Sequence, residues 1–134
     1  MILQEATVMR IALLFDSALR PETTGVYCRR ALGEIAEVEH YTVDELATID
    51  PNRFDAYVHV DDGLRYTLPS HLRPSIWWAI DTHMDLDWAI QKARTFDFVF
   101  AAQKDGAESL RNAGVNDAEW LPLACAPPHS LCQQ

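Results

Sequence analysis

The stretch Ser75–Ile80, with the sequence SIWWAI, is a short apolar run, and the polar residues DTH at positions 81–83 follow it directly. A continuous run of this length, without polar alternation, is typical of a strand buried on both faces of a parallel sheet. Neighbouring Trp77 and Trp78 must point to opposite faces of such a strand. We therefore expect both faces of the sheet to be covered.

Other segments repeat this pattern along the chain. Buried-type runs occupy Val8–Phe15, Phe54–Val60 and Phe98–Ala102. The half-polar segment Val38–Tyr41 predicts a strand near an edge of the sheet. A last strand at Trp120–Leu123 is also expected at an edge, because its proline cannot donate a hydrogen bond to a neighbouring strand.

Segments with helical spacing separate these runs. Apolar residues that would share one face of a helix are Cys28, Ala31, Leu32 and Ile35, then Leu86, Ala89, Ile90 and Ala93, then Ala107 and Leu110. Asp85 is the predicted N-cap of the second helix, and Asp105 with Glu108 resembles the capping box of the third. Asp44 is predicted to cap a brief helix that ends before Pro51.

Strands and helices that alternate at regular spacing indicate an α/β fold with right-handed crossovers. We predict a Rossmann/flavodoxin-like doubly wound parallel sheet of five to six strands in a single three-layer domain. The favoured strand order is 2-1-3-4-5 with an added edge strand, and 3-2-1-4-5 is the alternative. The domain is expected to span residues 1–125, with 126–134 as a loose tail or the start of an interdomain linker.

The composition narrows the classes of partner. The 134 residues include 20 Asp and Glu against 11 Lys and Arg, which gives a net charge of −9 at pH 7. Nucleic acids and anionic membranes bind clustered Lys and Arg, so neither is an expected partner. No apolar run approaches the roughly 18 residues of a membrane span, and no secretory signal is recognisable. Three cysteines without C-x-x-C spacing indicate reduced thiols, so we expect a cytoplasmic protein.

The strand ends hold the candidate site residues, because sheets of this kind bind ligands at the carboxyl ends of their strands. These residues are Asp16, Asp61, Asp62, Asp81, His83 and Gln103. The loop with Thr23, Thr24 and Gly25 leads into the first helix at the same edge, where free N–H groups would face an anion or a sugar hydroxyl.

Each candidate also has a structural interpretation. Aspartate at a strand end is a common turn or cap residue. His83 beside Asp81 could act as a general base, whereas His59, inside a strand, is interpreted as a core histidine. The segment 81–87 holds three aspartates and a histidine, but its spacing matches no EF-hand and no metal is expected. A receiver domain would also place acids at strand ends, but it needs a lysine after the last strand, and no lysine lies beyond Lys104.

Several motifs in order carry a resemblance to a known family. They are RPSIWWAIDTH at 73–83, FDFVFAAQ at 96–103, LRNAG at 110–114 and WLPLA at 120–124. This series resembles the N-terminal half of CgeB-like (spore-maturation-type) glycosyltransferases. Gly25-Val26-Tyr27 and the segment from Phe54 to Gly63 add to the resemblance, which covers residues 9–128.

The resemblance implies a GT-B fold, in which two Rossmann-like domains face each other across a cleft. The N-terminal domain would hold the acceptor and often a catalytic base, the C-terminal domain would hold the nucleotide sugar, and no metal or other cofactor would be needed. Gly25, Asp61, Asp62, Asp81 and His83 would line the cleft. Together with the strand-end residues, this predicts acceptor binding by Gly25, Asp16, Asp61, Asp62 and Gln103, and catalysis by His83 and Asp81.

The sequence ends at Gln134, where the family would continue into its donor-binding domain. We therefore expect an acceptor-side half that is inactive alone and tends to self-associate. Its expected partners are a C-terminal nucleotide-sugar-binding domain or another chain, and a carbohydrate or other hydroxyl acceptor. The alternative is a stand-alone flavodoxin-like binding or protein-interaction module without catalysis, because this architecture hosts many functions.

Overall fold

The computed structural model describes residues 7–16 and 24–123. Within these residues, six parallel strands form one sheet in the order β2-β1-β3-β4-β5-β6. The strands are β1 (Arg10–Leu14), β2 (Glu37–Tyr41), β3 (Ala56–Val60), β4 (Ser75–Ala79), β5 (Phe98–Ala101) and β6 (Glu119–Trp120). The Rossmann/flavodoxin-like α/β fold and the favoured strand order are confirmed, and the alternative order is excluded.

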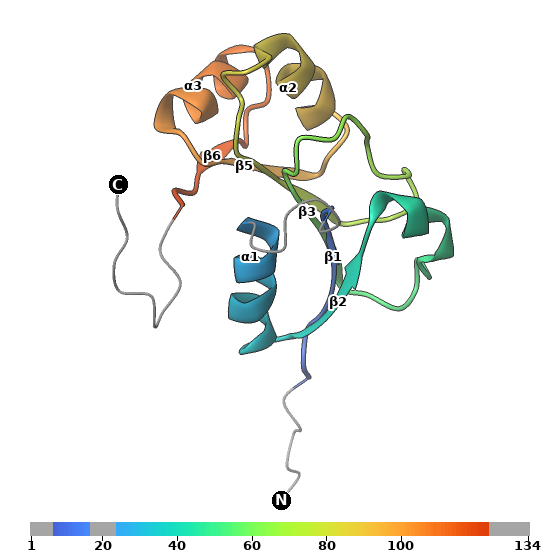
Figure 1. The fold of residues 1–134 in the computed structure, drawn as a ribbon. Coiled ribbons are helices and arrows are strands. Elements are labelled where there is room, and N and C mark those ends of the chain that lie inside the picture. The colour runs from blue at the N-terminus through green and yellow to red at the C-terminus, as the bar shows by residue number, and fades with distance from the viewer. Residues whose placement is uncertain (1–6, 17–23, 124–134) are drawn as a thin grey trace, which may run out of the picture.

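The helices lie on both sides of the sheet. They are α1 (Thr24–Gly33), the 3-10 helix η1 (Val43–Thr48), α2 (Leu86–Ala93) and α3 (Lys104–Asn112). Figure 1 shows α1 against one face and α2 with α3 against the other. This arrangement follows from right-handed crossovers, because the chain moves from β1 toward one edge and from β3 toward the opposite edge.

The face beneath α2 and α3 is tightly packed. Trp77 and Ala79 of β4 and Val99 and Ala101 of β5 are each at most 2% exposed. Alanine and leucine side chains from the two helices cover them, among them Ala89, Ala93, Ala107 and Leu110. Toward β1 the same face continues through a second cluster formed by Ala12, Leu14, Ile49, Phe54, Tyr57 and Leu72.

The opposite face is covered only in part. Over β1 and β3, residues Val26, Cys28 and Leu32 of α1 pack against Leu13 and Phe15. The expectation that Ala31 and Ile35 point inward is wrong, since both are exposed. Helix α1 ends at Gly33, before Ile35 is reached, and its buried side begins at Gly25.

The adjacent tryptophans of β4 do point to opposite faces, but they are not equally buried. Trp77 is 2% exposed, whereas Trp78 is half-buried and Phe98 on the neighbouring strand is 49% exposed. Among the described residues, α1 is the only helix on this face, and it does not extend over β4 to β6. Within residues 7–16 and 24–123, this face is therefore only partly covered over β4 and β5.

Two helix starts differ from the predictions. Thr42, not Asp44, is the N-cap of η1, and it forms a capping box with Glu45. Helix α3 begins at Lys104 after its N-cap Gln103, one residue before the predicted capping-box residue Asp105. The prediction for Asp85 is confirmed, since its side chain accepts a hydrogen bond from the backbone N–H of Trp88 at 3.1 Å.

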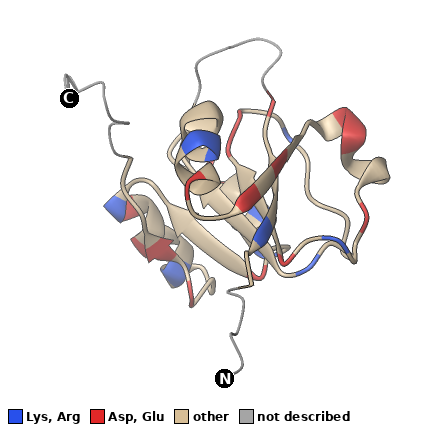
Figure 2. Ribbon diagram, turned by 90° about the horizontal axis from the view of Figure 1, so that it is seen from below, with Lys and Arg blue, Asp and Glu red and all other residues tan. Residues whose placement is uncertain are grey.

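The surface charges are mixed. Figure 2 shows Lys and Arg positions dispersed over helices, strands and loops among the Asp and Glu positions. Of the helices in ranges 7–16 and 24–123, none is long and apolar enough to cross a membrane.

Candidate functional site at the carboxyl ends of the strands

Asp61 joins the ends of β3 and β4. Its Oδ2 atom accepts hydrogen bonds from the backbone N–H groups of Ile80 at 3.1 Å and Asp81 at 3.3 Å. The strand-ending aspartate therefore fixes the backbone that presents Asp81.

Asp62 likewise joins the ends of β1 and β3 through hydrogen bonds from backbone N–H groups. Its Oδ2 atom accepts from the backbone N–H of Asp16 at 2.8 Å and from the Tyr66 hydroxyl at 3.1 Å. Its Oδ1 atom accepts from the backbone N–H of Leu64 at 3.0 Å. The structure thus brings Asp16, Asp61, Asp62 and Asp81 to one edge of the sheet, as parallel strands require.

The remaining predicted residues, Gln103, Gly25 and His83, do not line the cavity described below. Gln103 follows β5, and its buried Oε1 atom has no hydrogen-bond partner among the described residues. Gly25 is buried beneath Phe15, whose ring leaves no room for a side chain at this position. His83 is exposed in the turn after β4 and does not line the cavity described next.

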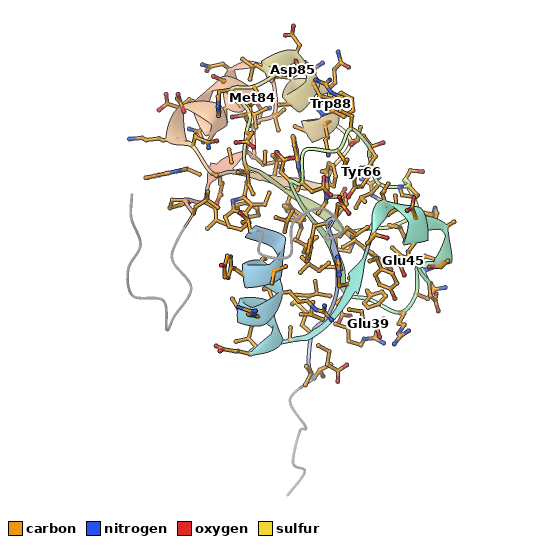
Figure 3. All side chains as sticks on the ribbon, in the orientation of Figure 1. Glu39, Glu45, Tyr66, Met84, Asp85 and Trp88 are labelled. Atoms are coloured by element: carbon orange, nitrogen blue, oxygen red, sulfur yellow. The ribbon has the colours of Figure 1, made fainter. Side chains whose placement is uncertain are left out.

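A cavity of about 230 Å³ opens beside Asp61 and Asp81. Its walls come from segment 61–65, the end of β4 and the first turn of α2, and they include Asp61, Arg65, Trp77, Asp81, Asp85 and Trp88. Figure 3 shows Met84, Asp85 and Trp88 gathered around the start of α2. The cavity therefore combines carboxylates with two indole rings at the edge where this fold binds its ligands.

Arg65 holds segment 61–65 against α2. Its guanidinium donates to Asp85 Oδ2 at 2.5 Å and lies 5.2 Å from the centre of the Trp88 ring. The hydrogen bond from Arg65 lowers the pKa of Asp85. Asp85 and Arg65 thus compensate each other's charge, and the cation–π contact adds to their attachment.

Trp77 forms the inner wall of the cavity. It is 2% exposed, and its Nε1–H group finds no acceptor within the part of the chain that the structure describes. Leaving a buried donor without a partner costs about 1–3 kcal/mol. Because the Nε1 atom itself is buried, it is not open to a ligand in the cavity.

Behind Trp77 lies a buried Lys92–His59 pair. The Lys92 ammonium, 1% exposed, donates to Nε2 of His59 at 2.8 Å, and Nδ1 of His59 lies 3.0 Å from the carbonyl oxygen of Leu14. The ammonium also lies about 5 Å from the ring centres of Trp77 and Tyr66. This geometry fits a neutral histidine protonated at Nδ1.

Burial shifts both groups toward their neutral forms. It lowers the pKa of Lys92 to about 8, although Asp61 and Asp62 oppose the shift. Burial and the Lys92 charge lower the pKa of His59 to about 4. His59 is therefore a core histidine, as its place within a strand indicated, and it serves to accept a hydrogen bond from a buried lysine.

Sequence reasoning missed Lys92 and the aromatic walls of the cavity. Lys92 lies three residues after Ala89, on the inward side of α2, and this helical spacing could have indicated that its side chain is buried. Trp88 and Arg65 gave no such signal, because they meet only after the chain folds across more than twenty residues.

Comparisons of the chain with protein families, with curated proteins and with solved structures find no match. In residues 7–16 and 24–123, no group of three or more His, Cys, Asp and Glu side chains could hold a metal ion.

Proposed function

We propose that the chain is the acceptor-side half of a two-domain glycosyltransferase of the CgeB-like type, and that the acceptor binds in the cavity beside Asp81. The observation that carries the proposal is the cavity itself. There the exposed Asp81 side chain and the Trp77 and Trp88 side chains line one cavity at the carboxyl ends of the strands. The ordered sequence motifs supply the reaction class.

The cavity offers two kinds of surface that suit a sugar. A sugar hydroxyl donates a hydrogen bond, which the Asp81 carboxylate can accept. The Trp88 ring provides an apolar surface for the C–H face of a sugar ring. A polyhydroxylated ring matches both.

The size of the cavity fits a half site. Its volume of about 230 Å³ lies below the roughly 300–1,000 Å³ of a complete ligand pocket. One sugar ring therefore fills it, and the remaining surface of acceptor and donor needs a second domain. In the proposed enzyme, that domain holds the nucleotide sugar.

The proposed reaction assigns proton removal to Asp81. The acceptor hydroxyl gives its proton to the Asp81 carboxylate, and its oxygen bonds to the anomeric carbon of the donor. The bond from that carbon to the phosphate oxygen breaks, and the nucleotide leaves with the electron pair. Asp81 suits this role because it lines the cavity and Asp61 fixes its backbone, whereas His83 lies outside.

Asp81→Asn is expected to lower kcat by about 100-fold or more, because the amide cannot accept the proton. The measurement is nucleotide release by this chain joined to its donor-binding domain, with neutral sugars as acceptors. Asp87→Asn is the matched control, since Asp87 is an exposed carboxylate outside the cavity. Asp81→Asn with the unaltered rate would contradict the proposal.

A second function, the stand-alone interaction module, is favoured by the apolar sheet face over β4 and β5. Trp78, Ile80 and Phe100 are half-buried there, and Phe98 is 49% exposed. Doubly wound parallel sheets normally bury both faces. This face therefore suits another polypeptide.

If a second copy covers this face, the sedimentation coefficient of the chain is expected to rise with concentration. Phe98→Ser should then shift the chain toward the monomer. Ile35→Ser, at a residue 77% exposed beyond the end of α1, should leave association unchanged. A chain that remains monomeric at every concentration would speak against this second function.

A further inference from the structure

The sheet face on the α1 side carries an open strip, formed by the side chains of Trp78, Ile80, Phe98 and Phe100. We infer that this strip binds one amphipathic helix of a partner protein, and that a Lys or Arg side chain beside the apolar stripe of that helix pairs with Glu119. The inference rests on the second function proposed above, the interaction module, and it names the kind of partner. It does not depend on the glycosyltransferase proposal.

The floor of the open strip is continuous with the hydrophobic core. Trp78 and Ile80 pack against the buried cluster that lies beneath α1. Phe98 and Phe100 are their neighbours on β5, because β4 and β5 pair in parallel. Within residues 7–16 and 24–123 these side chains stay half-buried or exposed, although doubly wound sheets normally bury both faces. An element with an apolar face would complete this layer.

The width of the open strip matches one helix. Helix α1 covers β1 and β3, since its side chains pack against Leu13 and Val60. Helices packed side by side lie about 8–10 Å apart, which equals two spacings of about 4.8 Å between strands. A helix placed next to α1 therefore lies over β4 and β5, the two strands of the open strip (Figure 1).

The segment after β6 bounds the strip on the side away from α1. The indole N–H of Trp78 donates to the carbonyl oxygen of Leu121 at 3.0 Å, and the Leu121 and Leu123 side chains are 44% and 49% exposed. The hydrogen bond satisfies the polar atom of the Trp78 side chain, so the floor requires no acceptor from a partner. The apolar stripe of an amphipathic helix meets this condition, since its backbone groups are bonded within the helix.

Glu119 adds a charge at the edge of the strip. The register of β5 and β6 pairs it with Phe100, and paired residues of neighbouring strands point to the same face. Glu119 is exposed, and none of the ion pairs among the described residues includes it. A Lys or Arg on the flank of the bound helix can pair with this carboxylate. The net charge of −9 on the chain favours the approach of such a helix.

The test uses three synthetic peptides of about 18 residues, a length at which a helix can form. The first has leucines at helical spacing and lysines beside them, the second replaces each lysine with glutamate, and the third scrambles the order of the first. Fluorescence anisotropy of the labelled peptides measures binding to the chain. The ¹⁵N indole signal of Trp78, assigned with Trp78→Phe, reports the place of binding.

The lysine peptide is expected to bind most tightly and to shift the Trp78 signal, while the signal of Trp88, in α2 on the other face, stays in place. Phe98→Ser should weaken this binding about 10-fold or more, because the helix would otherwise bury the phenylalanine ring. Ile35→Ser, beyond the end of α1, should leave it unchanged.

Glu119→Gln should weaken binding of the lysine peptide by about 3–5-fold, which is the effect of one solvent-accessible ion pair. Glu108→Gln is the matched control. It removes the same charge from an exposed position of α3, on the other face of the sheet, and should change binding little. The comparison separates a pair at Glu119 from the general attraction of an acidic chain for a basic peptide.

Three outcomes would overturn the inference and leave the interaction module standing. They are equal binding of the lysine and scrambled peptides, equal effects of Glu119→Gln and Glu108→Gln, and a dimer in sedimentation that the lysine peptide does not dissociate. The last would identify a second copy as the occupant of the strip. If no peptide shifts the Trp78 signal and the chain stays monomeric, both the inference and the interaction module are wrong.

Discussion

His59→Leu is expected to lower the free energy of unfolding by about 3–5 kcal/mol at pH 7, because its removal leaves a buried charge without its partner. The Lys92 ammonium is 1% exposed, and His59 Nε2, at 2.8 Å, is the acceptor that the structure gives it. The Trp77 and Tyr66 rings would remain near it, but a π-face replaces a hydrogen-bond acceptor only in part.

The loss should depend on pH in a defined direction. The pKa of Lys92 is lowered to about 8 in the folded chain, whereas an unfolded lysine titrates near 10.4. Between these values the unfolded state binds more protons, so the free energy of unfolding rises with pH. At pH 9 the buried amine is mostly neutral, and His59→Leu should cost less than at pH 7.

The unaltered protein should also lose stability in acid. The pKa of His59 is lowered to about 4, and an unfolded histidine titrates near 6.5. The unfolded state therefore binds the additional proton as the pH falls from 6.5 to 4, and the folded state becomes less favourable. His59→Leu should remove this part of the acid sensitivity.

Urea denaturation at pH 5, 7 and 9 provides the measurement. The double variant His59→Leu/Lys92→Met should recover most of the loss, since two apolar side chains replace the polar pair. His71→Leu, at an exposed histidine, is the control and should change little. A double variant no more stable than His59→Leu would show that Lys92 is not the source of the cost.

The fold was predictable because its decisive signals are local. Largely apolar runs such as Val8–Phe15 and Phe54–Val60 are typical of strands in the interior of a parallel sheet, and β1 and β3 are found within them. The polar character of Val38–Tyr41 placed β2 at an edge for the same reason. The strand ends then placed Asp61, Asp62 and Asp81 at one edge of the sheet.

The candidate site was only half predictable, because its walls depend on contacts distant in sequence. Arg65 reaches Trp88 and Asp85 after segment 61–65 folds against α2, and no periodicity reports this approach. Lys92 resembles an ordinary cation in the last turn of a helix until the inward direction of α2 is known. His83 is adjacent to the site in sequence, yet the turn after β4 carries it away from the cavity wall.

Gly25 shows how a sequence signal can have a packing cause. The residue opens α1 at the ligand-binding edge, which suggested a backbone N–H kept free for an acceptor. In the structure it is buried against Phe15, and a Cβ atom built on it would lie 2.3 Å from Cγ of that ring. The absence of a side chain at Gly25 is therefore required by the ring, whatever the N–H group contacts.

Gly25→Ala is accordingly expected to destabilise the fold by about 2–3 kcal/mol through overpacking. The Phe15 ring has little freedom to move, because it is 2% exposed and stacked on His40 with 3.9 Å between ring centres. Gly33→Ala in the same helix is the matched control: no atom lies within 4 Å of its Cβ position, so it should be neutral or stabilising by up to about 1 kcal/mol.

Urea denaturation of both variants, together with Gly25→Ala in a Phe15→Leu background, separates packing from other causes. The smaller leucine gives the new methyl group space, so the cost of Gly25→Ala should shrink there, and the two changes should not add. A cost that is identical with phenylalanine and with leucine at position 15 would mean that the ring does not require the glycine. The predicted acceptor contact of the Gly25 N–H group would then become the stronger explanation for the residue.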